Sequence, residues 1–189
     1  MVSRNPSLIA LSDFLARQPR GLTSSVVSYA EFEQGKITPS RVIGIDILIQ
    51  NAMKRSSEGA IAVIENLHPD DVETLGSSLD IDPFFFGGHI ASSYHDVEKR
   101  APPPLVSLLP SRITSQNFLN IHYQRAVHSG VEQASNHATY KLTGGGNVDR
   151  TIRRVPSLSG QTICLIRGCV SVLKKRLTGS KWICATIYQ

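Results

Sequence analysis

Two short stretches of this sequence have the form of helix starts led by a proline, and they constrain the fold more than any other feature. Pro69 opens the first stretch and is followed by Asp70 and Asp71. A proline costs nothing at the first helical position, where its missing N–H has no partner to lose, and acids in the first turn complement the helix dipole. Asp82 and Pro83 repeat the arrangement, with Asp82 as the capping residue. The sequence therefore predicts two consecutive helices in the middle of the chain.

Runs rich in isoleucine, valine and other apolar residues surround the predicted helices and have the length of strands. These runs are Arg41–Gln50, Ala60–Ile64, Leu105–Leu109, Phe118–Val127, Thr151–Val155, Thr162–Leu173 and Lys181–Ile187. The last two flank Leu177-Thr178-Gly179-Ser180, a composition that favours a hairpin turn. Because strands outnumber helices, we expect an α/β (α+β) fold: a single mixed-sheet domain with central helices and a C-terminal β-hairpin.

Composition and length fit one domain with an irregular arm. The chain has 189 residues, of which 41% are apolar and 19% charged, so it can bury a core. Residues 1–40 mix proline, serine, glycine and charges with weak periodicity, and they predict an irregular arm with one short helix near Ser7–Arg17. We expect residues 41–189 to form the domain.

Acidic and basic residues occupy different parts of the chain. Nine acids and no lysine or arginine lie between Glu58 and Glu98, whereas thirteen basic residues and two acids follow from Lys99 onward. Such parts can neutralise each other within one fold or across a subunit interface, and self-association is the partner that we expect. We expect no nucleic-acid partner, because the basic residues are not interleaved with stacking aromatics and no nucleic-acid motif is present.

No segment of the sequence predicts a membrane span or a secretion signal. No run reaches the roughly 18 uninterrupted apolar residues of a membrane helix, and the apolar patch at Leu8–Leu11 is followed at once by Asp13 without a convincing cleavage site. The three cysteines, Cys164, Cys169 and Cys184, are odd in number and contain no CxxC pair. We therefore expect a non-secreted, cytoplasmic chain in a reducing compartment.

Five stretches together resemble the N-terminal soluble domain of the fungal CorA-like, or magnesium-transporter-like, proteins. They are Ala60–Asn66, Leu79–Phe85 with Gly88–Ile90, Asn120–Arg125, Ile163–Val172 and Lys181–Cys184, in the order of that family. The Leu-Asp-Ile-Asp-Pro-Phe-Phe run is the most specific of them, and the likeness covers roughly residues 40 to 188. The resemblance implies an α/β domain on the cytosolic side of two membrane helices, in a pentamer.

The transport machinery of that family has no counterpart in this sequence. In the family the ion path is lined by a membrane helix that ends in a Gly-Met-Asn signature, and this tripeptide is absent here. The sequence stops at Gln189, about where the family continues toward its long stalk helix. We expect either a fragment of a longer transporter-type protein or a domain that serves alone.

Four aspartates are the candidate metal ligands: Asp70, Asp71, Asp80 and Asp82. Oxygen ligands close together in sequence suit a hard divalent cation such as Mg2+, and the family resemblance implies that acids of the domain can bind regulatory magnesium between subunits. The alternative is helix capping, with Asp82 before Pro83 and the other acids in a first turn. The spacing does not match an EF-hand loop.

The candidates for acid–base chemistry are His89, His95, His122 and Tyr123. They form a pocket only if the fold brings them together, and otherwise each has a structural role. No Gly-x-Ser-x-Gly nucleophile motif occurs in the sequence. The three glycines at 144–146 lack the partners of a phosphate loop and the spacing of a dinucleotide fingerprint, so we expect no nucleotide cofactor.

Three functions from different classes are compatible with these observations. The first is a non-catalytic regulatory or assembly domain of a CorA-like divalent metal cation transporter-type protein, which binds Mg2+ weakly through its acidic middle. The second is a small enzyme that uses the domain's pocket for proton transfer or cyclisation. The third is a self-association module. The first is the function that we expect from the sequence.

Overall fold

A computed structural model describes residues 8–17, 24–54, 57–91, 116–128, 139–142, 147–154, 163–177 and 179–188. The helices within these ranges are α1 (Ile9–Leu15), α2 (Ile45–Met53), α3 (Pro69–Leu79) and α4 (Pro83–Ile90). The strands are β1 (Val26–Glu33), β2 (Lys36–Ile37), β3 (Arg41–Ile43), β4 (Gly59–Glu65), β5 (Phe118–His128), β6 (Thr139–Leu142), β7 (Arg150–Arg154), β8 (Ile163–Arg176) and β9 (Trp182–Tyr188).

The nine strands of the described ranges belong to one mixed sheet. Their order is β2-β1-β4-β9-β8-β7-β6, with β3 paired to β1 and β5 paired to β8. Only the β4–β9 pair among them is parallel. The long strand β8 pairs with β5 along one edge, while β9 and β7 pair with successive parts of its other edge. The structure thus confirms the predicted mixed α/β fold and the hairpin of β8 and β9.

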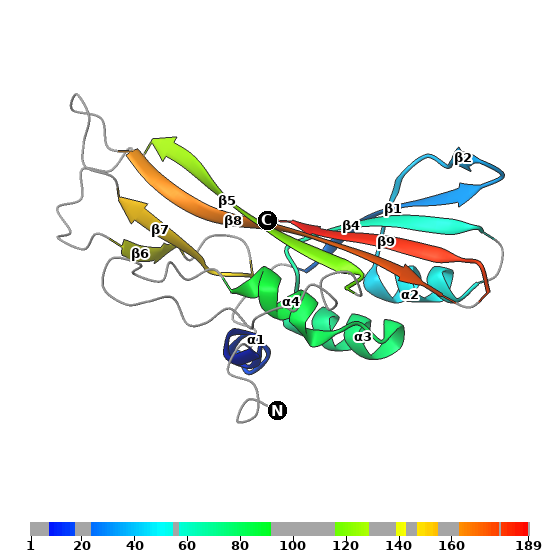
Figure 1. The fold of residues 1–189 in the computed structure, drawn as a ribbon, viewed down its shortest axis with the longest axis horizontal. Helices are drawn as coiled ribbons and strands as arrows, with labels where there is room; N and C mark the ends of the chain where they lie inside the picture. Colours follow the sequence, from blue (N-terminus) through cyan, green and yellow to red (C-terminus); the bar gives the residue numbers. More distant parts are fainter. Residues whose placement is uncertain are drawn as a thin grey trace.

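The four helices lie together on one side of the sheet (Figure 1). The buried strand residues project to this side, because alternate residues of β1, β4 and β9 are buried while their neighbours are more exposed. The core between the two layers includes Val27, Tyr29, Ala62, Ile64, Ile183 and Ile187 of the sheet and Phe14, Leu48, Leu75, Phe85 and Phe86 of the helices. The ring of Phe85 also packs edge-on against Phe118, which fixes α4 on β5.

Both proline-led helices form where the sequence predicts them. The imidazole Nδ1 of His68 accepts a hydrogen bond from the backbone N–H of Asp70 at 3.3 Å, which caps α3. At the start of α4 the carboxylate of Asp82 accepts from the N–H of Phe84 at 2.9 Å. Between the helices Asp80 adopts a left-handed conformation, with φ at 48°, and ends α3. The chain therefore turns sharply at Asp80 and starts the next helix at Pro83.

The predicted strand over Arg41–Gln50 is wrong beyond Ile43. Only β3 is extended, and α2 begins at Ile45, directly after Gly44 at the N-cap. Apolar residues on every side of this segment suggested a strand buried on both faces. The structure instead buries Ile45, Leu48 and Ala52 along one helical face. In the sequence this helical spacing is not evident, because other isoleucines occupy the positions between these residues.

The expectation of an irregular arm over residues 1–40 is also corrected. The short helix near Ser7–Arg17 is confirmed as α1, but β1 lies within residues 1–40 and pairs with β4 from Val26 to Phe32. Its inward residues Val27 and Tyr29 are fully buried. Glu31 and Glu33, which follow at the next alternate positions, interrupt the apolar alternation in the sequence. The strand predicted at Leu105–Leu109 lies outside the described residues, whereas the remaining predicted strands are confirmed as β4, β5, β7, β8 and β9.

Candidate functional site

The four aspartates do not gather at one place. Asp70 and Asp71 lie in the first turn of α3, and Asp80 lies at the opposite end of this helix of 11 residues. At 1.5 Å per residue the two ends are about 15 Å apart. Asp80 is engaged by Lys175 of β8, whose ammonium donates to the Asp80 carbonyl and lies 3.2 Å from its carboxylate. No group of three or more metal-ligating side chains occurs in the part of the chain that the structure describes. Magnesium binding stays a prediction.

We expect Asp82→Ala to lower the free energy of unfolding by about 0.5–2 kcal/mol, because Asp82 caps α4. Asp82→Asn retains the cap and removes the charge, so it should cost much less. Thermal unfolding of both variants, with and without millimolar Mg2+, measures the effect. A capping role requires the same loss in both conditions. A loss that grows with Mg2+ would instead identify Asp82 as a cation ligand.

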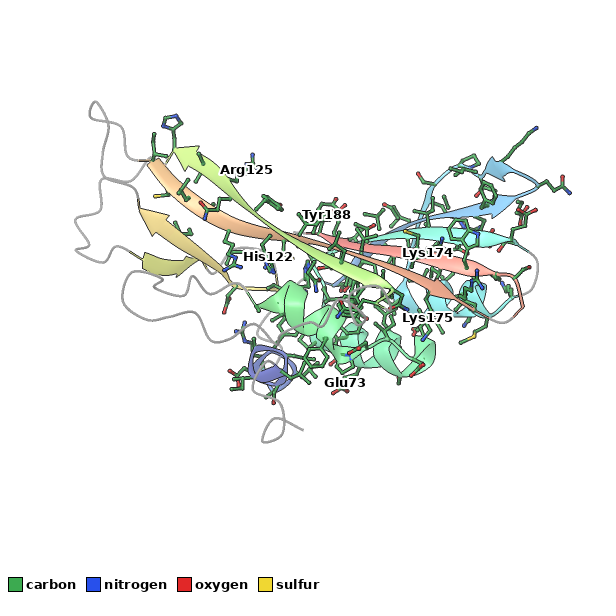
Figure 2. All side chains as sticks on the ribbon, in the orientation of Figure 1. Glu73, His122, Arg125, Lys174, Lys175 and Tyr188 are labelled. Carbon is green, nitrogen blue, oxygen red and sulfur yellow. The ribbon has the colours of Figure 1, made fainter. Side chains whose placement is uncertain are left out.

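Of the acid–base candidates, the structure brings His89 and His122 toward each other. His122 of β5 lies opposite Cys169 of β8 on the helix side of the sheet, and Figure 2 shows it projecting toward α4, which carries His89. Tyr123 is on the other side, where its ring lies over Gly168 and would clash with any Cβ there. His95 lies outside the described residues. Among the three candidates that the structure describes, His89 and His122 therefore lie on the same side of the sheet and Tyr123 lies on the other.

His89 is the centre of a buried chain of hydrogen bonds. A guanidinium N–H of Arg150 points to His89 Nε2 at 3.5 Å, and His89 Nδ1 lies 2.9 Å from the hydroxyl of Ser171. Because arginine only donates, Nε2 is the acceptor and Nδ1 carries the proton. The Ser171 hydroxyl is 3.5 Å from Cys169 Sγ, and that thiol donates to the carbonyl of Gly88 at 3.9 Å. Each of these four hydrogen bonds therefore has a defined donor and a defined acceptor.

The environment keeps His89 neutral. Its side chain is fully buried, and this burial, together with the charge of Arg150, lowers the pKa of His89 to about 3. Burial likewise raises the pKa of the Cys169 thiol, which therefore stays protonated. Burial also lowers the pKa of His122, with Arg167 and Arg150 adding to the effect. The cluster holds a neutral imidazole and a neutral thiol beside a fixed guanidinium charge.

This arrangement positions α4 and is a poor nucleophile site. In the assigned tautomer His89 donates to Ser171 and so cannot remove its proton, while its basic nitrogen is occupied by Arg150. Another guanidinium N–H donates to the backbone carbonyl of His89 at 3.1 Å. Arg150 and Ser171 thereby tie the end of α4 to β7 and β8. We interpret the cluster as a polar lock between the helix layer and the sheet.

The sequence singled out His89 and His122 but not their partners. Arg150, Cys169 and Ser171 are brought to His89 from strands far along the chain. Ser171 carried a weak signal, because it is a polar residue at an inward position between Val170 and Val172 of an apolar strand. A buried hydroxyl at such a position requires a hydrogen-bonding partner. No pattern in the sequence indicated that His89 is the hydrogen-bonding partner of Ser171.

A second candidate is the side of the sheet opposite the helices, here called the open face. No helix of the described ranges lies on it (Figure 1). Seven exposed large apolar residues project from it: Val26, Ile37, Val42, Leu119, Ile121, Tyr123 and Tyr188. The registers place Ile121, Val170 and Tyr188 in one row across β5, β8 and β9, and Leu119, Val172 and Thr186 in the next. The apolar residues are therefore contiguous over several strands.

Comparison with known proteins gives no family for this chain. Neither a protein-family model nor a curated protein sequence matches it. Within the described ranges, the structure contains no helix of the length and apolar character needed to cross a membrane. The resemblance to CorA-like proteins therefore stays a prediction from the sequence.

Proposed function

We propose that this chain is a non-catalytic assembly domain that binds a further copy of itself through the open face. The single observation that carries the proposal is the contiguous apolar surface of this face. Monomeric proteins rarely expose apolar patches that extend over several strands, and such patches mark interaction sites. An antiparallel sheet with one solvated face ordinarily alternates apolar residues inward with polar residues outward. The open face departs from that pattern across β5, β8 and β9.

A second copy suits the open face because the face carries charges of both signs around its apolar centre. Glu65 of β4 lies in register with Tyr188, and its proximity raises the pKa of the Tyr188 hydroxyl. Lys174 of β8 and Arg125 of β5 lie on the same face, and both are exposed (Figure 2). In a twofold arrangement each surface meets its own copy, so an acid of one copy can approach a base of the other. Apolar surface with such a polar rim is typical of homodimer interfaces.

The sequence resemblance supplies the class of assembly that we propose. In this proposal the chain is the regulatory or assembly domain of a CorA-like divalent cation transporter-type protein. Its support is that the stretches that carry the resemblance coincide with structural elements: three of them supply parts of β5, β8 and β9. The most specific run forms the α3–α4 junction, including the Asp82 cap. These stretches build the fold, so they support a shared architecture and not a shared transport activity.

Replacement of Ile121 by lysine tests the proposed association. Ile121 is 48% exposed on the open face, in one row with Val170 and Tyr188. A lysine there would place an unpaired charge in the apolar contact. We expect the wild-type chain to be dimeric at tens of micromolar and Ile121→Lys to weaken association by about a hundredfold. Ile47→Lys is the matched control, since Ile47 of α2 is 47% exposed on the helix layer. Sedimentation velocity measures both.

The same measurements at low and high salt separate two modes of association. Contact through the apolar open face should persist when salt is raised, whereas pairing of the acidic middle with the basic C-terminal part should weaken, because exposed charges are screened beyond about 8–10 Å. A wild-type chain that is monomeric in both conditions would contradict the proposal. An equal effect of Ile47→Lys and Ile121→Lys would also contradict it.

A further inference from the structure

Among the described strands, β5 forms a border of the sheet. It pairs with β8 in one unbroken register from Phe118 to His128, and no other described strand pairs with it. Edge strands are ordinarily short, bulged, or interrupted by proline or several charges, because a long regular edge can bind another chain. Strand β5 has no proline and no bulge, and Arg125 is its single lysine, arginine or acid. Its length and regularity therefore suit it to accept a further strand.

The backbone groups at the outer edge of β5 belong to its even-numbered residues. The N–H of Lys174 donates to the carbonyl of Asn117, the residue before β5, at 2.7 Å. Along an antiparallel pair, residues whose N–H and C=O groups face the partner strand alternate with residues whose groups face away from it. The odd-numbered residues of β5 therefore bond to β8. The even-numbered residues, from Phe118 to His128, direct their N–H and C=O groups to the outer edge.

The middle of β5 is exposed on both sides of the sheet. Residues 121–126 are all exposed, although consecutive residues of a strand project to opposite sides. Ala126 is among them, and its single methyl group can shield little of the backbone at the outer edge. An added strand at this position would therefore find both its backbone and its side-chain contacts accessible.

Exposed cations lie at both ends of an apolar row along β5. Leu119, Ile121 and Tyr123 form the row on the open face. Arg125 follows them at one end, and Lys174 lies beside the residue that precedes β5 at the other end (Figure 2). The strands β5, β6, β7 and β8 contain no aspartate or glutamate. The edge therefore favours a strand that is apolar in its middle and acidic at its ends.

We propose that the outer edge of β5 binds an extended segment of another protein as an added strand, with apolar residues at alternate central positions and an acid near each end. The even-numbered residues of β5 supply the backbone hydrogen bonds, and the apolar row and the two cations select the side chains. A second copy of β5 fits less well, because β5 contains no acid to approach Arg125. The site uses the border of the sheet, so it is additional to self-association through the open face.

A synthetic peptide as long as the stretch from Asn117 to Arg125 tests the charge pattern. It has glutamate at both ends, valine at alternate positions between them, threonine at the others, and blocked termini. We expect calorimetric titration to detect one peptide per chain, and replacement of both glutamates by lysine to weaken binding about tenfold. Arg125→Gln should weaken binding of the glutamate peptide about threefold and leave a glutamine-ended peptide unaffected.

Gln124→Pro tests the backbone contact. The N–H of Gln124 faces the outer edge, so proline removes a donor from the edge without removing a hydrogen bond to β8. We expect roughly tenfold weaker binding of the glutamate peptide. Gln124→Ala is the matched control, because it keeps the N–H and should bind as the wild type does. An undiminished affinity of a folded Gln124→Pro variant would contradict the proposal.

Hydrogen exchange of the wild-type chain keeps the test independent of how Gln124→Pro folds. The peptide should slow exchange at the amides of His122, Gln124 and Ala126, whereas those of Ile121 and Tyr123 are already protected by β8. Unchanged exchange at the even-numbered amides would overturn the proposal, as would equal affinity for the glutamate and lysine peptides. Protection of these amides in the free chain that disappears on dilution would also overturn it, because a second copy would then occupy the edge.

Discussion

Acidification from pH 6 to pH 4 is expected to destabilise the wild-type chain by about 1.4 kcal/mol per pH unit more than the variant His89→Gln. The native pKa of His89 is about 3, against 6.5 for an ordinary histidine. The unfolded chain therefore binds a proton at His89 over this range and the native chain does not. The contribution to stability is complete above pH 6.5 and is lost as the pH falls toward 3.

Urea unfolding at several pH values measures the two slopes, and their difference removes the contribution of the carboxylates, which both proteins share. His128→Gln serves as the control, because His128 is exposed at the end of β5. Its stability should follow that of the wild type across the range. Parallel curves for the wild type and His89→Gln would show that His89 is protonated in the native state, contrary to the assigned network.

Lys181→Met is expected to lower the free energy of unfolding by about 3 kcal/mol. Lys181 is 5% exposed, and its ammonium donates to the backbone carbonyls of Asn51 at 2.8 Å and Lys54 at 2.6 Å. These carbonyls belong to the C-terminal end of α2, where helices leave acceptors without partners. Hydrogen bonds to a charged group contribute about 1.5–3 kcal/mol each, and methionine fills similar space without the donors.

Lys36→Met provides the matched comparison for Lys181→Met. Lys36 is exposed on the short strand β2, and a surface substitution of this kind changes stability by about 0.5 kcal/mol or less. Urea unfolding midpoints of the two variants give the difference directly. A loss in Lys181→Met no larger than that in Lys36→Met would show that water, and not Lys181, satisfies the end of α2.

Local chemistry made the helices α3 and α4 predictable from the sequence. Their starts depend on neighbouring residues: a proline at the first position, with His68 or Asp82 as the cap. The segment of α2 was predicted as a strand because local chemistry does not decide its structure. An apolar segment of that length fits the periodicity of a strand and that of a helix, and only its packing against the sheet selects the helix. Strand β1 was not predicted, because its place in the sheet depends on pairing with β4. The residues of β1 and their neighbours in the sequence carry no pattern that indicates this pairing.

The candidate sites were predictable only in part. His89 and His122 were singled out as titratable residues. The partners of His89 were not, because Arg150 and Ser171 lie 61 and 82 positions away from it in the sequence. The open face was not visible in the sequence either. Its residues are scattered over β1, β2, β3, β5 and β9, and they form one surface only after the strand order and register are known.

The position of β9 beside β4 has a consequence for how the chain folds. Among the described strands β9 comes last along the sequence, yet it joins β4 to β8 at the middle of the sheet. During synthesis β1 and β4 can pair early, and α2 and α3 can then pack on them. The second edge of β4 stays unpaired until residues 182–188 leave the ribosome. Parallel pairing over so long a loop is entropically slow, and the waiting apolar edge can bind other chains. The chain should therefore depend on chaperones at this stage. Mildly destabilising substitutions in β9 should reduce the amount of folded protein that is produced by more than their effect on the free energy of unfolding would predict.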